Sequence, residues 1–197
     1  PRSFVVSKRR IGGTRSSAWR DSRRPNSGSN STPSNAPSTS SVTPVLDLPT
    51  LLRALERERV RSVLVGGMAV VFHGGLRFTR DVDLAVAFDP ENRRALARAL
   101  APLSPRPLRA RPDAPWPFDE TCLVAPWSTW NTDAGRVDVL VRLPGIDDGF
   151  EGLSARAIPV TVGETALRIA SREDLVAMKE AAGRPRDLED LRFLRRG

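Results

Sequence analysis

The sequence predicts an α/β protein with a small mixed sheet flanked by helices, two of them at the C-terminal end. Short segments of alternating polarity, such as 81–86 (DVDLAV) and 135–141 (GRVDVLV), are typical of strands. Other segments have apolar residues three and four apart and begin after Asp, Ser or Pro, which is typical of helices. Because the two kinds of segment alternate along the chain, we expect a sheet covered by helices.

Residues 1–44 differ in composition from the rest of the chain. They are rich in Ser, Pro, Asn and Arg, and residues 25–41 are of low complexity. We therefore expect a disordered basic tail over 1–44, followed by one domain over 45–197. The tail is interpreted as accessory or as foreign to the natural protein. A nucleic-acid-binding arm and an organelle transit peptide are the alternatives.

The net charge of +8 is unevenly distributed, because the tail alone contributes +7. The domain is thus nearly neutral, and the basic pI is no evidence that it binds nucleic acid. No run of 18 apolar residues is present, so no membrane span and no membrane partner are predicted. A single cysteine, Cys122, excludes an intrachain disulfide and a Cys-based zinc cluster. These features favour a cytoplasmic protein.

The first half of the domain is predicted as follows. A helix begins at Asp47 and buries Leu51, Leu52, Leu55 and Val60. It is followed by a strand over 63–65, a short helix over 68–72 that ends at His73-Gly74-Gly75, a strand over 81–86 and a helix over 91–101.

The second half contains a region whose prolines break any regular pattern. Six prolines between 102 and 117 predict a surface loop without regular structure. We expect the later elements to be a strand over 118–128 that contains Cys122, a turn over 127–131, a strand over 135–141, a hairpin of 158–162 with 166–169, and helices over 172–182 and after Arg184. Trp116, Trp127 and Trp130 are interpreted as core or loop anchors rather than platforms for bases.

Two carboxylates stand out in the strand over 81–86. Val82, Leu84 and Val86 face one way, and Asp81 and Asp83 face the other. Their Cα atoms are roughly 6–7 Å apart. Like charges this close repel, whereas Mg²⁺ prefers carboxylate oxygens. The pattern therefore predicts a cation site, with a solvated strand end as the alternative.

Gly66 and Gly67 lie where the strand over 63–65 meets the next helix. Glycines at such a junction allow backbone N–H groups to approach a phosphate. An ordinary tight turn is the alternative. A phosphate cradle beside two carboxylates predicts phosphoryl or nucleotidyl transfer. Asp138, on the polar face of the strand over 135–141, is a candidate third ligand that could also accept the proton of the attacking hydroxyl; taken alone, it is equally well a surface residue.

His73 is the only histidine of the chain and has no second histidine or cysteine to share a zinc ion. We expect it to pack the turn or to orient Arg77. Arg77 is a candidate phosphate contact because its guanidinium is a forked donor.

The pattern GG-x-A…HGG-x-R-x-T-x-DVDL resembles nucleotidyltransferases with a polymerase-beta-like fold, and among them the AbiEii/MenT-type toxins of toxin–antitoxin systems. The resemblance extends from about residue 47 to the end of the chain. It implies an Mg²⁺-dependent enzyme that uses an NTP and two ions held by Asp81, Asp83 and Asp138. It further implies transfer of a nucleoside monophosphate, with a pyrimidine favoured, to the tRNA 3′ end, which blocks translation and growth.

The resemblance also implies roles for residues near the C-terminus. The segment REDLVAMKEAAGRPRDLEDL is similar to the signature in which a Lys is followed by R-x-x-D. It implies that Lys179 binds the nucleotide phosphates and that Asp187 supports the site, with Asp190 the competing residue. Without the resemblance, the segment is an ordinary helix face with pairs such as Arg186–Asp190.

In the toxin branch, a Ser or Thr at the position of Thr79 is phosphorylated by the cognate antitoxin, a kinase. A phosphate there adds a charge of about −1.5 to −2 beside the carboxylates, so it would compete for the metal and repel the triphosphate. The alternatives are a nucleotidyltransferase that modifies an antibiotic or a protein, and a non-catalytic nucleic-acid-binding partner. The nucleotide, the acceptor, the antitoxin and the oligomeric state are left open by the sequence.

Overall fold

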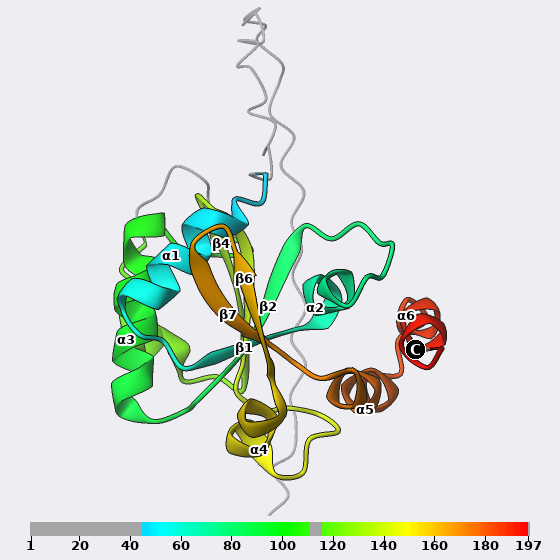
Figure 1. Cartoon of the computed structure of the whole chain (residues 1–197). Helices are drawn as coiled ribbons and strands as arrows, with labels where there is room; N and C mark the ends of the chain where they lie inside the picture. The colour runs from blue at the N-terminus through cyan, green and yellow to red at the C-terminus, as the bar shows by residue number, and fades with distance from the viewer. Residues whose placement is uncertain (1–44, 111–115, 197) are drawn as a thin grey trace, which may run out of the picture. The chain divides into compact units, whose positions relative to one another are not determined.

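A computed structural model describes residues 45–110 and 116–196 (Figure 1). The predicted tail over 1–44 therefore lies outside the described residues. Within the part that is described, no helix is both long and apolar enough to cross a membrane.

The model has the predicted α/β fold, a mixed sheet flanked by helices with two helices at the C-terminal end. The helices are α1 (Leu48–Arg57), α2 (Gly66–Phe72), α3 (Pro90–Leu100), α4 (Gly149–Arg156), α5 (Arg172–Ala182) and α6 (Asp187–Leu194), with 3-10 turns at Ala101–Leu103 and Glu120–Leu123. The strands are β1 (Ser62–Val65), β2 (Asp81–Val86), β3 (Arg106–Pro107), β4 (Trp127–Thr132), β5 (Gly135–Leu140), β6 (Ile158–Val162) and β7 (Thr165–Ile169).

The N-cap residues that the sequence predicts for two helices form capping hydrogen bonds. The Asp47 carboxylate accepts the Thr50 N–H at 3.0 Å and caps α1, and the Ser171 hydroxyl accepts the Asp174 N–H at 3.1 Å and caps α5. Helix α5 ends at Gly183, whose φ of 59° suits glycine. The sharp turn there allows α6 to fold back onto α5.

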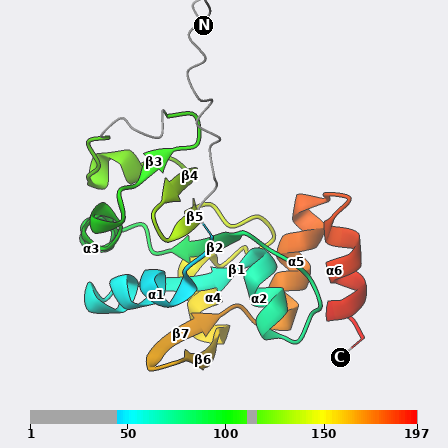
Figure 2. The same ribbon diagram turned by 90° about the horizontal axis from the view of Figure 1, so that it is seen from above.

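The strand order β3-β4-β5-β2-β1-β7-β6 brings four chain segments to one end of the sheet. β1 runs antiparallel to β2, so β1 ends where β2 begins, with Val65 opposite Asp83. β5 is parallel to β2 and begins at this end, and β7 is parallel to β1 and ends there. Figures 1 and 2 show α2, α5 and α6 gathered at this end and α1 and α3 at the other. We call it the α2 end of the sheet.

Strand β2 contributes buried side chains to the core on both of its faces. Val82, Leu84 and Val86 are buried, as their alternation predicts. Ala85, on the opposite face together with Asp81 and Asp83, is also fully buried. Both faces of β2 are therefore covered beyond its first three residues, and its polar part is confined to the α2 end.

The prediction for residues 118–131 was wrong. Cys122 lies in the 3-10 turn Glu120–Leu123, and residues 127–131 belong to strand β4 instead of a turn. β4 pairs with β5 as a hairpin in which Thr132 lies opposite Gly135, whose φ is 112°. Trp130 and Thr132 are buried whereas Trp127 is exposed, so Trp130 is a core anchor and Trp127 is not. The polar side chains of this strand conceal its period of two.

The proline-rich region is more regular than predicted, because Arg106–Pro107 forms a short strand beside β4. Proline is tolerated there since β3 is an edge strand. Val60, predicted in the stripe of the first helix, lies beyond the end of α1.

Candidate active site

The structure brings Asp81, Asp83 and Asp138 together at the α2 end. Asp83 of β2 is the register partner of Asp138 of β5, and Asp81 lies two residues before Asp83 on the same face. Neighbouring strands are about 4.8 Å apart, so the Asp83 and Asp138 backbones are adjacent. Asp138 is only 3% exposed, which excludes the alternative that it is a surface residue.

The three carboxylates repel one another. Burial, followed by the charges of Asp81 and Asp138, raises the pKa of Asp83 to about 6, although the Gly67 N–H donates to this carboxylate and opposes the shift. Ionisation of Asp83 therefore costs more free energy than ionisation of an exposed aspartate.

Each carboxylate is held by a partner of its own. The Thr79 hydroxyl donates to Asp81 Oδ1 at 2.5 Å, and Arg136 Nη2 donates to Asp138 Oδ2 at 3.2 Å. In these orientations, no three His, Cys, Asp or Glu side chains within 45–110 and 116–196 form a cluster that holds a metal ion. The predicted three-ligand site is thus not formed by the described side chains as they stand.

The residues nevertheless fit a cation. Among the described side chains, Asp138 Oδ1 is buried and has no hydrogen-bond partner. A cation between Asp138 and Asp83 would satisfy that oxygen and remove the repulsion that raises the Asp83 pKa.

Gly66 and Gly67 form the first turn of α2 rather than a loop before it. A Cβ at Gly66, whose φ is 62°, would lie 1.9 Å from Asp83 Oδ2, and a Cβ at Gly67 would lie 2.8 Å from Arg77 Cζ. The glycines therefore admit the side chains of Asp83 and Arg77 against the backbone of α2. In this arrangement the Gly67 N–H, predicted to face a phosphate, is directed at Asp83.

An ion network from the C-terminal helices lies beside the carboxylates. Lys179 Nζ is 2.6 Å from Asp190 Oδ2 and 3.3 Å from Asp187 Oδ1, and all three residues are buried. Arg77 Nη1 contacts Asp190 at 2.6 Å, and Arg184 Nε contacts Asp187 at 2.7 Å. Asp187 and Asp190, predicted as competitors, thus both belong to the network. Of its five charges three are positive, so it has a net charge of +1.

The hydrogen bonds from Arg184 and the charge of Lys179 outweigh the burial of Asp187, and they lower the pKa of this carboxyl. Asp187 therefore remains ionised and keeps both cations in place. His73 lies outside the network: its Nε2 is 2.8 Å from the Ala170 carbonyl oxygen, so it fastens the turn after α2 to the start of α5. Arg77 forms its ion pair with Asp190, and the expectation that His73 orients Arg77 has no support in the contacts of His73.

A small polar hollow lies between the carboxylates and the network. It is lined by Gly67, Arg77, Asp81, Asp83, Lys179, Arg184, Arg186 and Asp187. Its volume of about 10 Å³ is that of about one water molecule. The hollow thus unites most of the predicted site residues in a space smaller than a nucleotide.

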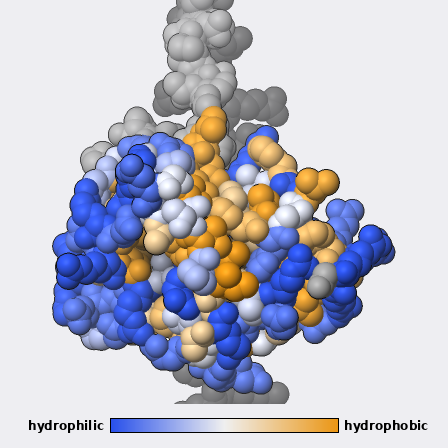
Figure 3. All heavy atoms as spheres, in the orientation of Figure 1, coloured by the Kyte–Doolittle hydropathy of each residue, from blue (hydrophilic) through white to orange (hydrophobic). Residues whose placement is uncertain are grey.

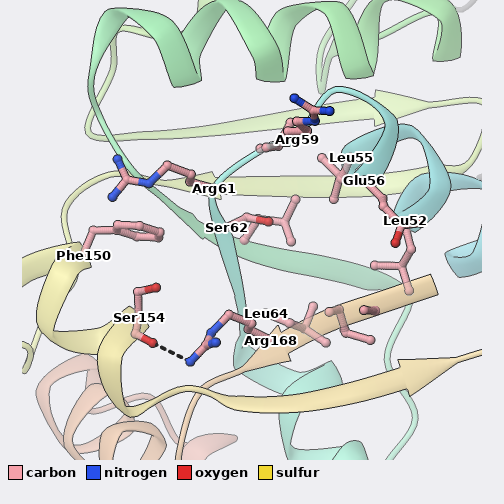
Figure 4. A pocket seen from close by; sticks show the side chains of 14 residues that line it. Leu52, Leu55, Glu56, Arg59, Arg61, Ser62, Leu64, Phe150, Ser154 and Arg168 are labelled. Carbon is pink, nitrogen blue, oxygen red and sulfur yellow. Dashed lines mark hydrogen bonds between the residues drawn. The ribbon is translucent and has the colours of Figure 1, made fainter.

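A larger pocket of about 340 Å³ lies elsewhere, where Leu64 and Leu84 form part of an apolar floor (Figure 4). Arg59, Arg61 and Arg168 surround it, and Arg168 donates to the Ser154 carbonyl at 2.9 Å. None of the predicted site residues lines it. We therefore assign the active site to the small hollow, because the grouped carboxylates and cations, not the volume, indicate the chemistry.

Three arginines of the site were not singled out from the sequence. Arg184 and Arg186 line the hollow, and Arg136 holds Asp138. The signal for Arg184 was the Arg of R-x-x-D, and the signal for Arg136 was its place two residues before Asp138 on one strand face. Nothing in the sequence distinguishes Arg186 from other exposed arginines.

A sheet with paired carboxylates at one end, next to basic residues from flanking helices, defines a nucleotidyltransferase. A family model supports this class. It describes a nucleotidyltransferase of unknown function (DUF6036) and matches residues 47–193. The chain belongs to this family. No curated protein matches the chain.

The chain is also similar to solved structures. A presumed nucleotidyltransferase from Thermotoga maritima has 16% sequence identity and a TM-score of 0.49, with 76% of this chain and 91% of that chain covered. The antibiotic-resistance factor ANT(2″)-Ia in solution has 16% identity and a TM-score of 0.48, with 74% and 79% covered. The same factor with adenylyl-2″-tobramycin has 14% identity and a TM-score of 0.45, with 74% and 84% covered.

Gly66→Ala is expected to be more destabilising than Gly163→Ala. Both glycines have φ near 60°, so both substitutions impose a backbone cost of about 1 kcal/mol. Only the new Cβ at residue 66 overlaps Asp83, which adds about 1–3 kcal/mol. Urea unfolding measures both. In an Asp83→Ala background the extra cost of Gly66→Ala should become smaller, because only the Cβ of residue 83, at 2.8 Å, remains close; an undiminished difference would show that the Asp83 carboxylate is not the cause.

In the absence of divalent cations, the free energy of unfolding should depend on pH through Asp83. Its folded-state pKa of about 6 exceeds the ordinary 3.8, so the stabilisation from its protonated form is complete below pH 4 and is lost as the pH rises through 6. The loss is about 3 kcal/mol. In EDTA, Asp83→Asn should therefore gain stability relative to wild type between pH 4 and 7. Added Mg²⁺ should stabilise the wild type more than the variant. A difference that is independent of pH would contradict the shift.

Proposed function

We propose that the protein is an Mg²⁺-dependent nucleotidyltransferase toxin that transfers a nucleoside monophosphate from an NTP to RNA, with the tRNA 3′ end as the acceptor. The observation that carries the chemistry is the pairing of Asp83 with Asp138 beside Asp81, next to the cations of the hollow. The acceptor and the toxin role are supported by the resemblance of residues 63–88 to AbiEii/MenT-type toxins. A pyrimidine nucleotide is favoured on the same ground.

In the proposed reaction, the acceptor hydroxyl oxygen forms a bond to the α-phosphorus of the NTP. The bond from this phosphorus to the oxygen of the leaving pyrophosphate breaks, and the hydroxyl proton moves to Asp138. Asp138 suits this role because Arg136 holds its Oδ2 while its Oδ1 accepts no hydrogen bond from the described residues.

Asp81, Asp83 and Asp138 would hold the two Mg²⁺ ions. Such ions neutralise charge on the transferred phosphate and favour ionisation of the attacking hydroxyl. Thr79 and the Gly67 N–H hold Asp81 and Asp83 in place through hydrogen bonds to their carboxylates. These hydrogen bonds restrict the rotation by which the two carboxylates could converge on a cation.

The triphosphate is proposed to bind over the hollow, in contact with Arg77, Lys179 and Arg184. The hollow itself is too small for it, so the exposed Arg186 would turn outward to admit the phosphates, while Arg184 stays paired with Asp187. Gly67 lines the hollow, so phosphates bound over it would approach the backbone of α2 beside Arg77. Lys179 is buried between Asp187 and Asp190, so its charge is fixed in position before the nucleotide binds.

Thr79 is proposed as a site of inhibitory phosphorylation by a kinase antitoxin. Its hydroxyl is the group that donates to Asp81 Oδ1. Phosphorylation replaces this donor with a dianionic group next to a carboxylate, which displaces Asp81 and repels the incoming triphosphate.

The proposed function is tested with purified protein, each labelled NTP, Mg²⁺ and total tRNA. We expect label in tRNA with wild type, none with Asp81→Asn, and an unchanged amount with Asp147→Asn, which replaces an exposed carboxylate outside the hollow. The proposed role as a toxin that acts on tRNA would be excluded if no NTP labels tRNA. The protein in that experiment must be folded and carry no phosphate on Thr79. Label in an aminoglycoside or in a protein would instead establish one of the alternative acceptors.

Thr79→Glu should lower the rate of transfer by at least about tenfold, because it places a negative charge beside Asp81. Thr79→Val removes only the hydrogen bond and should have a smaller effect. Initial rates at saturating NTP, with both variants checked for folding by circular dichroism, measure the difference. Equal rates for the two variants would argue against electrostatic inhibition at this position.

A further inference from the structure

The segment that joins α2 to β2 has two different faces. Arg77 and Thr79 point inward, where they contact Asp190 and Asp81. The alternate residues Leu76, Phe78 and Arg80 are exposed. We call residues 75–80 the connecting segment. Hydrogen bonds to the carboxylates of Asp190 and Asp81 hold Arg77 and Thr79 on the inner face. The residues between and beside them are therefore held on the outer face.

The outer face exposes large apolar side chains next to the active site. Phe78 is 76% exposed and Leu76 fully exposed, and Figure 3 shows hydrophobic atoms at the surface over this segment. Two large apolar side chains exposed close together beside a candidate active site are suited to contact a ligand. The core does not use these side chains, so burial against the protein does not account for them.

A cation accompanies the aromatic ring. The Arg80 guanidinium carbon lies 5.4 Å from the centroid of the Phe78 ring. An aromatic ring stacks on any nucleobase, and an adjacent arginine binds the phosphate that links one nucleotide to the next. Arg184 and Arg186 at the hollow continue the positive charge towards the carboxylates. The pairing of ring and cation fits a single-stranded nucleic acid.

The position of Phe78 limits which nucleotide it can contact. It precedes Asp81 by three residues, so the two Cα atoms are at most about 11 Å apart. Stacked nucleotides advance about 3.4 Å each, and an extended strand advances further. A base on Phe78 would therefore lie within about three nucleotides of a hydroxyl that reacts beside Asp81.

We propose that Phe78 and Arg80 form the acceptor-binding surface of the enzyme, where one base of the single-stranded 3′ end of the RNA stacks on the Phe78 ring. This inference rests on the proposed function, and it adds the residues that hold the acceptor. Phe78 contributes to binding of the acceptor and not to binding of the NTP, because its side chain does not line the hollow.

The chain contains a matched control. Phe88 is 46% exposed and lies under Arg93, whose guanidinium carbon is 5.0 Å from the ring centroid. This second pair has the same chemistry but follows the far end of β2. Phe78→Ala should raise the KM for the RNA acceptor by about 5- to 100-fold, the range measured for the loss of one stacked base. The KM for NTP should not change. Phe88→Ala should leave both KM values unchanged. Phe78→Trp, which keeps an aromatic ring, should bind the acceptor as tightly as wild type does.

A second measurement does not depend on turnover. Fluorescence anisotropy of a labelled single-stranded RNA of eight nucleotides, at one salt concentration, should show weaker binding by Phe78→Ala than by wild type or Phe88→Ala. Equal anisotropy for Phe78→Ala and wild type overturns the acceptor surface whether or not tRNA is labelled, and an equal acceptor KM overturns it where tRNA is labelled. Failure of wild type to label any RNA, with weaker binding by Phe78→Ala retained, overturns the proposed function alone.

A partner protein is the competing occupant. It would bury Leu76 together with Phe78, whereas a stacked base needs only the ring and Arg80. Leu76→Ser should therefore leave the acceptor KM unchanged. Equal losses of RNA binding from Leu76→Ser and Phe78→Ala would indicate a general apolar contact and would overturn the stacking arrangement.

Discussion

The collection of three carboxylates at the α2 end is the constraint on which the surrounding structure depends. Asp83 is the most affected, since burial and two neighbouring charges raise its pKa to about 6. Gly66 is required because any side chain there would overlap the Asp83 carboxylate. Thr79 and Arg136 hold the other two carboxylates through single hydrogen bonds. An apolar strand would be more stable, so this arrangement is not explained by folding, and it supports the proposed binding of a cation.

Positive charge is supplied by a distant part of the chain. Lys179 and Arg184 come from α5 and the turn after it, and Asp187 and Asp190 of α6 keep them in place. Arg77 joins the same network from the segment before β2 through Asp190. A buried network of this kind contributes little net stability, but removal of one member leaves a buried charge without a partner. Its main effect is to fix the position of α6 relative to the carboxylates.

The parts of the structure that were predictable have a strict period. The alternation in 81–86 and 135–141 gave both central strands and the orientation of Asp81, Asp83 and Asp138. β4 was missed because Ser128 and Asn131 imitate a turn, and its burial depends on pairing with β5. The burial of Lys179 was not predictable either, since a lysine on a helix face is usually solvated; only the fold of α6 back onto α5 encloses it. The missed features thus depend on contacts between segments far apart in sequence.

The connecting segment combines the two tasks that a nucleotidyltransferase must coordinate. Because its residues alternate in an extended chain, Arg77 and Thr79 reach the charged site while Phe78 and Arg80 face solvent from the same backbone. A displacement of Asp81 through Thr79 would therefore also shift the ring of Phe78, which is its neighbour in the chain. Modification of one hydroxyl would then weaken both the metal site and the acceptor surface. The proposed control at Thr79 would then require no second regulatory site, since the connecting segment joins Thr79 and Phe78 through its own backbone.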